Sequence, residues 1–155
     1  MQREFMERAI ELSRIQMRTR RGGPFGAVIV KGGRIIAEGC NEVIARNDPT
    51  AHAEMMALRR AGPRLHAFHM DGCEIYASCE PCPMCLAAIY WARIEKIYFA
   101  NTAEDAAEIG FDDEFFYREI QMPRTERRIP SLQLMRDQAL PVFREWHNMD
   151  DRIEY

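Results

Sequence analysis

Three residues of this 155-residue chain have the types and spacing of zinc ligands. Cys82 and Cys85 are three positions apart, which places both sulfur atoms on one face of a helical turn. Pro83 between them suits the first position of a helix, and the free N–H groups at a helix start favour the thiolate form that a metal requires. With the neutral imidazole of His52, two thiolates balance the charge of Zn²⁺ and leave a fourth position for water, which is the open geometry of catalytic zinc sites.

Glu54 adds a candidate proton carrier to these ligands. It follows His52 by two positions, so the two side chains point to different sides of an ideal helix and converge on one water molecule only at the helix end. We infer that convergence from the chemistry, because a carboxylate beside an activated water can take its proton and pass it to a substrate. The combination H-x-E followed by P-C-x-x-C, here His52–Glu54 and Pro81–Cys85, is the signature of zinc-dependent nucleobase deaminases.

Other interpretations fit parts of the same pattern. A C-x-x-C pair also occurs in redox sites. If Cys79 binds the metal together with Cys82, Cys85 and His52, the site becomes a closed structural zinc centre of the Cys₃His type, without chemistry. That non-enzymatic alternative leaves Glu54 without a role, and the number of sulfur ligands distinguishes the two: three indicate a structural site and two a catalytic one.

Hydrophobic periodicity and turn signals predict the elements that position these residues. Residues 3–19 have helical periodicity and end at Gly22-Gly23-Pro24. Two β-rich runs, 25–31 and 34–40, are joined by Gly32-Gly33 and predict a hairpin. The next predicted elements are a loop over 41–49, a helix from about Thr50 to Gly62-Pro63, a strand over 73–78, a helix from Pro83 to about Ala92, and a strand over 95–100. This alternation predicts an α/β domain in which helices cover a mixed sheet.

The last third of the chain is less regular. Residues 104–119 contain seven acidic side chains and one basic one, and most runs of this kind form a solvated face. Residues 121–130 contain two prolines and three arginines and predict an extended connector. Residues 137–149 predict a final helix interrupted near Pro141.

Composition limits the possible partners and compartments. Hydrophobic residues make up 47% and charged residues 29%, and the net charge of −3 argues against nucleic acid or an anionic membrane as the main partner. The N-terminal segment is too highly charged for a signal peptide, and the longest apolar run, Cys85 to Ala92, is far shorter than the roughly 20 residues that span a bilayer. We expect one domain over residues 1–155, located in the cytoplasm, with reduced cysteines.

The sequence resembles the cytidine deaminase superfamily and, within it, the small bacterial guanine deaminases. Segments 22–43, 47–61 and 78–94 match the superfamily pattern, whereas the block 109–113 (IGFDD) and the terminal Glu154-Tyr155 point to guanine. The resemblance covers nearly the whole chain. It implies a three-layer α/β/α sandwich with a mixed central sheet, and one Zn²⁺ per subunit.

The resemblance also implies a reaction and the residues that perform it. Guanine would be hydrolysed at C2 to xanthine and ammonia, with Glu54 protonating a ring nitrogen and then the departing amino group. Asp113, the second aspartate of FDD, resembles the acidic residue that these enzymes use for substrate contact and proton transfer. Asn41 resembles the side chain that hydrogen-bonds the purine edge. Aromatic residues that suit a flat base are Phe25, Trp91 and Tyr155.

Guanine deaminases of this type are dimers that exchange their C-terminal segments, and the end of this chain fits that arrangement. Residues 114–155 are too long and too apolar to extend freely into solvent, and Pro123 and Pro130 flank a charged connector that suits a bridge between subunits. We therefore expect a homodimer in which Tyr155 caps a site, that of the partner subunit.

Related enzymes of the same superfamily remain alternatives. A tRNA adenosine deaminase shares the TAHAE and EPC-x-M-C patterns, but it needs a cationic path for phosphates, and this chain is acidic. Guanosine and cytosine deaminases differ in whether a ribose or only a base fits. The metal site would serve any amino-substituted heterocycle, so the choice of guanine depends on the resemblance alone.

Overall fold

The computed structural model of this chain describes residues 2–154, which divide into two compact units between Glu114 and Phe115. The first unit is built on a four-stranded sheet of order β2-β1-β3-β4. Its strands are β1 (Gly26–Lys31), β2 (Arg34–Cys40), β3 (Cys73–Cys79) and β4 (Lys96–Asn101). Strand β1 is antiparallel to both β2 and β3, whereas β3 and β4 are parallel. The sheet is therefore mixed, as predicted.

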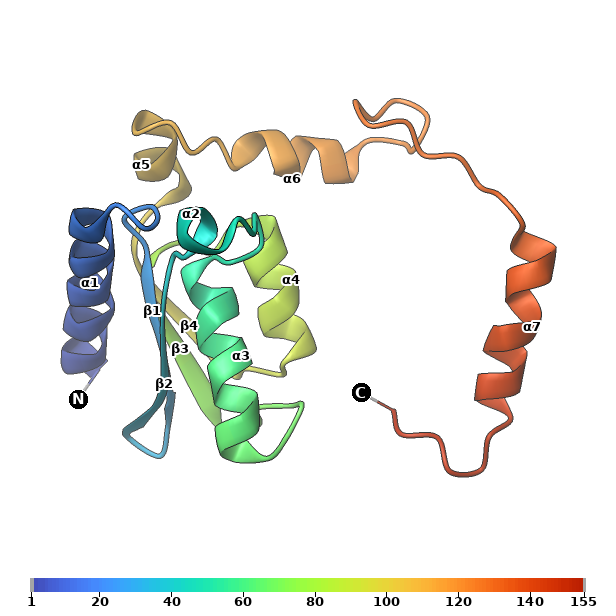
Figure 1. Cartoon of the computed structure of the whole chain (residues 1–155), viewed down its shortest axis with the longest axis horizontal. Coiled ribbons are helices and arrows are strands. Elements are labelled where there is room, and N and C mark those ends of the chain that lie inside the picture. The colour runs from blue at the N-terminus through green and yellow to red at the C-terminus, as the bar shows by residue number, and fades with distance from the viewer. Residues whose placement is uncertain (1, 155) are drawn as a thin grey trace. The chain divides into compact units, whose positions relative to one another are not determined.

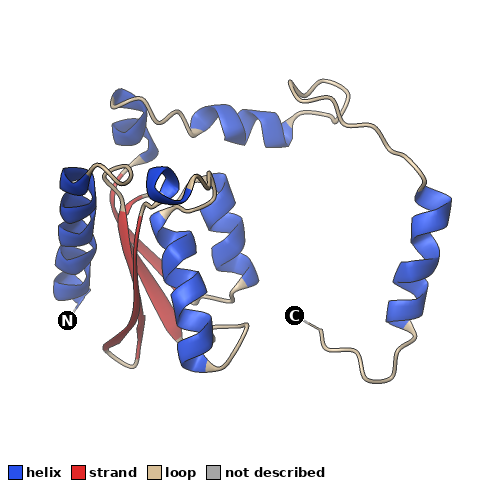
Figure 2. Cartoon of the chain, viewed as in Figure 1, coloured by secondary structure: helices blue, strands red, loops and turns tan. Residues whose placement is uncertain are grey.

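Helices cover both faces of this sheet. Helix α1 (Gln2–Thr19) lies on one face, and α3 (Ala53–Leu65) and α4 (Pro83–Trp91) lie on the other (Figure 1). Figure 2 shows the same arrangement, with the strands enclosed between helices. Strand β1 is buried along five of its six residues because helices pack against it from both sides. The predicted three-layer α/β/α sandwich is confirmed.

Two glycines allow the helices to pack closely on the sheet. A Cβ atom at Gly39 of β2 would lie 2.0 Å from the carbonyl oxygen of Ala53, the first residue of α3. A Cβ atom at Gly26 of β1 would lie 2.3 Å from the carbonyl oxygen of Ala9 in α1. Since real Cβ atoms do not approach backbone this closely, any side chain at these positions would push the helix away. Gly39 thus allows the start of α3, where His52 and Glu54 lie, to pack close to the sheet.

The boundaries of the predicted helix after residue 50 need correction. Helix α3 begins at Ala53 with His52 as its N-cap, and it continues through Gly62-Pro63 to Leu65. Pro63 is tolerated near the helix end, and the helix stops three residues later at His66, whose φ of 50° is left-handed. The predicted loop over 41–49 also contains a short helix, α2 (Val43–Arg46). Four residues are too few to show a helical period in a sequence.

The segment that follows β4 leads to a predicted site residue. Helix α5 (Ala103–Glu108) has Thr102 as its N-cap. The Thr102 hydroxyl accepts a hydrogen bond from the Asp105 N–H, while the Asp105 carboxylate accepts one from the Thr102 N–H. This reciprocal cap fixes the helix start, because two backbone N–H donors are satisfied at once. The chain then runs through residues 109–113 (IGFDD) to the end of the first unit.

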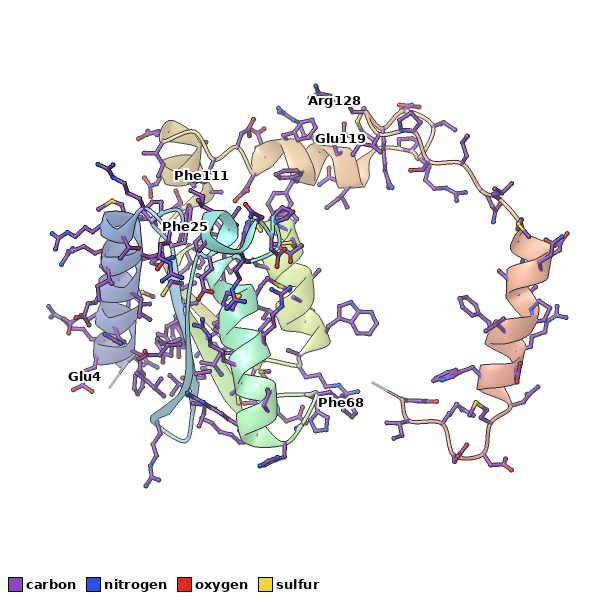
Figure 3. The ribbon with its side chains drawn as sticks, in the orientation of Figure 1. Glu4, Phe25, Phe68, Phe111, Glu119 and Arg128 are labelled. Atoms are coloured by element: carbon purple, nitrogen blue, oxygen red, sulfur yellow. The ribbon has the colours of Figure 1, made fainter. Side chains whose placement is uncertain are left out.

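Two predictions about the C-terminal segment are wrong. Helix α7 (Arg136–His147) runs through Pro141 without interruption. The connector over 121–130 bends instead of extending, because Arg127 folds back to donate hydrogen bonds to the carbonyl oxygens of Ile120 and Met122 at the end of α6 (Glu114–Gln121). The Arg128 N–H also donates to the Glu119 carboxylate at 2.9 Å, and both residues are labelled in Figure 3. Charged side chains thus close this turn.

None of the helices between residues 2 and 154 has the length and apolar composition needed to cross a bilayer.

Candidate metal and substrate site

The predicted zinc ligands come together at the starts of two helices. His52 is the N-cap of α3 and Cys82 the N-cap of α4, and both have extended backbones. Cys85 lies in the first turn of α4, on the same side as Cys82. One ligand atom from each of the three residues lies within 4.8 Å of the others, and His52 Nδ1 is 3.5 Å from Cys82 Sγ. The local sequence therefore builds one compact cluster from residues 30 positions apart.

The donor set fits one zinc ion. It offers one imidazole nitrogen and two sulfurs from partly or fully buried residues, which is the ligand chemistry of tetrahedral zinc with one open position. The neighbouring Cys85 thiol and His52 lower the pKa of Cys82 to about 4, which favours its thiolate form. Its proximity to Cys82 and its burial raise the pKa of Cys85, so a bound cation favours the ionised form of this second thiol.

Cys79 does not join the cluster. Its thiol donates a hydrogen bond to the carbonyl oxygen of Thr102 at 3.4 Å, and burial raises the pKa of Cys79 to about 11. Among the described residues the metal cluster contains only His52, Cys82 and Cys85. Two sulfurs instead of three favour the open catalytic centre, and the closed Cys₃His interpretation loses its third thiolate.

Glu54 lies beside the ligands, as the chemistry requires. It is the second residue of α3 and only 7% exposed, and its Oε2 atom accepts a hydrogen bond from the Cys85 thiol at 3.4 Å. Burial raises the pKa of Glu54 to about 7. A carboxyl group with a pKa near neutrality can both accept and return a proton, which is the property expected of a general acid and base.

A cavity of about 340 Å³ opens over this cluster. Its volume lies at the small end of the range for ligand sites. Among the predicted site residues, those that line it are Phe25, Asn41, His52, Glu54, Cys82 and Asp113. These residues come from five separated segments of the first unit, so the fold gathers metal ligands, two carboxyl groups and an amide around one space.

The Asn41 side chain is held in one orientation. Its Oδ1 atom accepts hydrogen bonds from the N–H groups of Gly23 at 3.2 Å and Val43 at 3.3 Å. The residue is 4% exposed and lines the cavity. Since Oδ1 is already used, the Nδ2 group is the part of this amide that can donate a hydrogen bond to a ligand.

Phe111 is a cavity residue that the sequence analysis did not single out. Its ring packs edge to face against Phe25, with centroids 4.9 Å apart and planes at 88°, and Figure 3 labels both residues. The two rings form an apolar wall that suits a flat aromatic ligand. Phe111 lies in the IGFDD block, so its position beside Asp113 was the signal that could have identified it.

Asp113 lines the same cavity. Burial and the negative charge of Cys82 raise the pKa of Asp113, which moves this carboxyl group toward its protonated form. Its backbone N–H donates to the carbonyl oxygen of Phe111 at 3.2 Å, so the two residues are placed by one tight turn. A second titratable carboxyl near Glu54 allows a proton to be held at two points of the cavity.

Glu80 also lines the cavity and was missed. Its carboxylate accepts a hydrogen bond from the Ala103 N–H at 3.2 Å, and its own N–H donates to the Asn101 carbonyl at 2.8 Å. It therefore ties the loop between β3 and α4, which carries Cys82, to the segment that leads to Asp113.

Two predicted substrate contacts are not placed in this cavity. Trp91 is the last residue of α4 and 68% exposed, at the opposite end of that helix from Cys82, and it does not line the cavity of the first unit. Tyr155 lies outside the described residues. The roles of Trp91 and Tyr155 in substrate binding stay predictions, because the described lining of the first unit's cavity includes neither residue.

Comparison with known proteins gives consistent matches. Residues 1–101 match the family described as the cytidine and deoxycytidylate deaminase zinc-binding region. A guanine deaminase of Bacillus subtilis (strain 168) is 52% identical over 151 residues, covering 97% of each chain. The X-ray structure of guanine deaminase from Bacillus subtilis superposes with a TM-score of 0.95 at 51% identity, covering 99% of this chain and 98% of that one. A tRNA-specific adenosine deaminase of Aquifex aeolicus (strain VF5) is 49% identical over 77 residues, 50% of this chain and 51% of that protein.

Proposed function

Since this chain belongs to the family of zinc-binding cytidine and deoxycytidylate deaminases, we propose that it is a hydrolase that converts guanine and water to xanthine and ammonia. The observation that carries this proposal is the similarity to a guanine deaminase over nearly the full length of both chains. The cavity supports it, because three carboxyl groups, an amide and two aromatic rings line the space beside the metal ligands. A flat base with an exocyclic amino group matches that lining.

The metal and the protein divide the chemistry. When bound by His52, Cys82 and Cys85, zinc supplies the Lewis acidity that makes water nucleophilic near neutral pH. Glu54 takes the proton from the water as its oxygen adds to C2 of guanine, and it delivers that proton to a ring nitrogen. Glu54 then passes the second proton of the water to the amino group, and the C2–N bond breaks to release ammonia. The raised pKa of Glu54, about 7, suits both directions of transfer.

The other cavity residues orient the base. Asn41 offers its Nδ2 group to an acceptor on the purine edge, because hydrogen bonds from Gly23 and Val43 occupy Oδ1. Asp113 contacts the substrate and assists proton transfer. Phe25 packs against the ring, and Phe111 extends the same wall. A fixed base places C2 for attack, which lowers the entropic cost of the reaction.

We also propose that the protein is a homodimer that exchanges residues 114–155. In the second unit, large apolar side chains such as Leu132, which is 93% exposed, and Leu134 lack cover. A contiguous group of such side chains indicates an interaction surface. Exchange would bring Tyr155 to the site of the partner subunit. It would also allow the exposed Trp91 ring to contact the substrate or the partner subunit.

We place the enzyme in the cytoplasm. The metal cluster needs two reduced sulfurs, and neither Cys82 nor Cys85 forms a disulfide. A reducing compartment preserves that state.

A tRNA adenosine deaminase is the second candidate function, favoured by the 49% identity with such an enzyme over half of the chain. The cavity argues against it. Among the described residues that line it are three acidic ones, Glu54, Glu80 and Asp113, and no lysine or arginine. A site that receives a polynucleotide needs cationic contacts to phosphates at its entrance.

A single assay separates these functions. Purified zinc-loaded enzyme is offered guanine, guanosine, adenine, cytosine, cytidine and a tRNA anticodon stem, and the ammonia released is measured. We expect guanine to be the best substrate by at least an order of magnitude. A higher kcat/KM for the tRNA stem, or for a nucleoside over its base, would replace the proposal with the corresponding activity.

A further inference from the structure

We propose that Gln16 of α1 is a positioning residue that fixes Asn41, so that the cavity presents a hydrogen-bond donor to the base; this inference deepens the proposed function and rests on it. Gln16 is neither one of the candidate metal ligands nor one of the residues that line the cavity. It acts through the backbone of Asn41, which enters the cavity from the end of β2.

Gln16 is a polar residue on the buried stripe of an amphipathic helix. The other buried residues of α1 are Phe5, Ala9 and Leu12, all apolar. Gln16 is only 8% exposed, and its Nε2 atom donates a hydrogen bond of 2.6 Å to the Asn41 carbonyl oxygen. A buried amide is costly unless it is hydrogen-bonded, so this contact satisfies both Gln16 and its acceptor.

The Asn41 backbone depends on this contact because it lies just beyond the sheet. The ladder between β1 and β2 ends at the pair Gly26 and Cys40. The Asn41 N–H still donates to the Phe25 carbonyl at 3.1 Å, as a strand residue would. The Asn41 carbonyl oxygen instead accepts its hydrogen bond from the Gln16 side chain. Without the Gln16 amide, that buried carbonyl loses its donor. An unpaired buried carbonyl costs free energy, which favours rotation of the peptide group toward another donor.

The surroundings leave Asn41 one orientation. A Cβ atom at Gly22 would lie 1.9 Å from the Asn41 carbonyl oxygen and 2.6 Å from its Oδ1, so the chain fits there only as glycine. The N–H groups of Gly23 and Val43 hold Oδ1. Within the described residues no hydrogen bond engages Nδ2. The site therefore presents a donor, and it selects bases with a carbonyl oxygen or unprotonated ring nitrogen at that edge.

The test is a double-mutant cycle on the zinc-loaded full-length enzyme with guanine as substrate. Gln16→Met keeps the length of the side chain and removes the donor. We expect it to raise KM by about fivefold to tenfold, the effect of losing one hydrogen bond, with a smaller change in kcat and no change in zinc content. In an Asn41→Ala background, Gln16→Met should change KM less than twofold, because it acts only through Asn41.

Controls keep the result interpretable. Thr19→Val removes a hydroxyl that donates to the Gln16 carbonyl at 2.8 Å in the same helix, and it should leave KM unchanged. Gln16→Glu has the shape of glutamine, but its ionised form cannot donate, so it should reproduce the rise in KM. Circular dichroism and melting curves show whether each variant is folded.

Defined outcomes would overturn the inference. Wild-type KM in Gln16→Met, or KM increases that combine multiplicatively with Asn41→Ala, would exclude positioning through Asn41. Unfolding of both Gln16 variants would assign the residue a purely structural role. Failure of the proposed function gives a different result, because the wild-type enzyme would then release no ammonia from guanine.

Discussion

The Sγ atom of Cys85 lies 3.4 Å from the Oε2 atom of Glu54, so a metal ligand and the candidate proton carrier share one hydrogen bond. The thiol donates and the carboxylate accepts. Metal binding removes the thiol proton and therefore ends this hydrogen bond, which frees the carboxylate for other donors. The ionisation of the zinc site and the availability of Glu54 are thus linked through a single pair of atoms.

Replacing Glu54 by glutamine tests its role as the proton carrier. Glutamine keeps the shape but cannot accept a proton from water, so we expect turnover of guanine to fall by about 10²–10⁴-fold. Zinc content, measured by atomic absorption, should stay at one per chain because Glu54 is not a ligand. Residual activity within tenfold of wild type would remove Glu54 from the mechanism.

Metal binding should depend on Cys82 and not on Cys79. We expect Cys82→Ser to lose most of its zinc and its activity, because the thiolate with the lowered pKa is absent. Cys79→Ser is the matched control, since that thiol donates to the Thr102 carbonyl, and a serine hydroxyl can do the same. X-ray absorption spectroscopy of the wild-type protein should count two sulfurs per zinc. A count of three, with zinc loss in Cys79→Ser, would support the structural Cys₃His site instead.

Asp113→Asn separates substrate handling from metal binding. Asp113 lines the cavity but lies outside the metal cluster. We expect kcat/KM for guanine to fall by at least tenfold while zinc content and melting temperature stay near those of wild type. Normal guanine turnover in this variant would contradict a role for the second carboxyl group.

The pair between Arg8 and Glu38 predicts a pH dependence of stability that does not involve the metal. Two hydrogen bonds, of 2.8 and 2.9 Å, join the guanidinium to the carboxylate and hold the pKa of Glu38 below its ordinary value of 4.5. Because the folded-state pKa is lowered, the pair stabilises the protein above the unfolded pKa, and this contribution is lost as the pH falls through the folded pKa.

Urea titrations of Glu38→Gln measure this contribution. The pair is partly exposed, so we expect the variant to lower the free energy of unfolding by about 0.5–1 kcal/mol at pH 7, and the difference from wild type to shrink below pH 4.5. Glu7→Gln, at the exposed Arg3–Glu7 pair, is the control and should have no measurable effect. A difference that grows on acidification would contradict the assigned sign.

Removing residues 150–155 tests whether the C-terminus caps a site. We expect activity to fall much more than the melting temperature, because these residues lie outside the first unit and its core. Mixing the truncated chain with a full-length chain carrying Glu54→Gln should restore part of the activity if the tail is exchanged between subunits. Equal losses of activity and stability would contradict the capping role.

The sequence predicted the zinc ligands because each lies at a local signal. Cys82 and Cys85 belong to one helical turn marked by Pro83, and the short spacing of His52 and Glu54 places both at one helix start. The α/β class followed from the alternation of helical and strand patterns, whereas the three-layer arrangement followed from the family resemblance. The predictions at the two prolines were wrong because α3 continues two residues beyond Pro63, and α7 continues through Pro141.

Residues that act across the fold left no local signal. In the sequence, Gln16 is an ordinary polar residue of a helix, and only the folded structure shows its hydrogen bond to the Asn41 carbonyl after β2. Phe111 is identified as a cavity residue only by its ring contact with Phe25, which is 86 positions earlier in the chain. Contacts of this kind depend on the packed sheet, and one sequence read alone does not contain them.

The parallel pairing of β3 and β4 divides the enzyme by chain position. Every metal ligand precedes β4, whereas Phe111 and Asp113 follow it, beyond the cap at Thr102. A new sequence grafted after residue 102 would therefore replace the part of the cavity lining that Phe111 and Asp113 provide, and would leave the metal ligands, Glu54 and Asn41 in place. Chimeras joined at this point are the natural starting library for deaminases of altered preference.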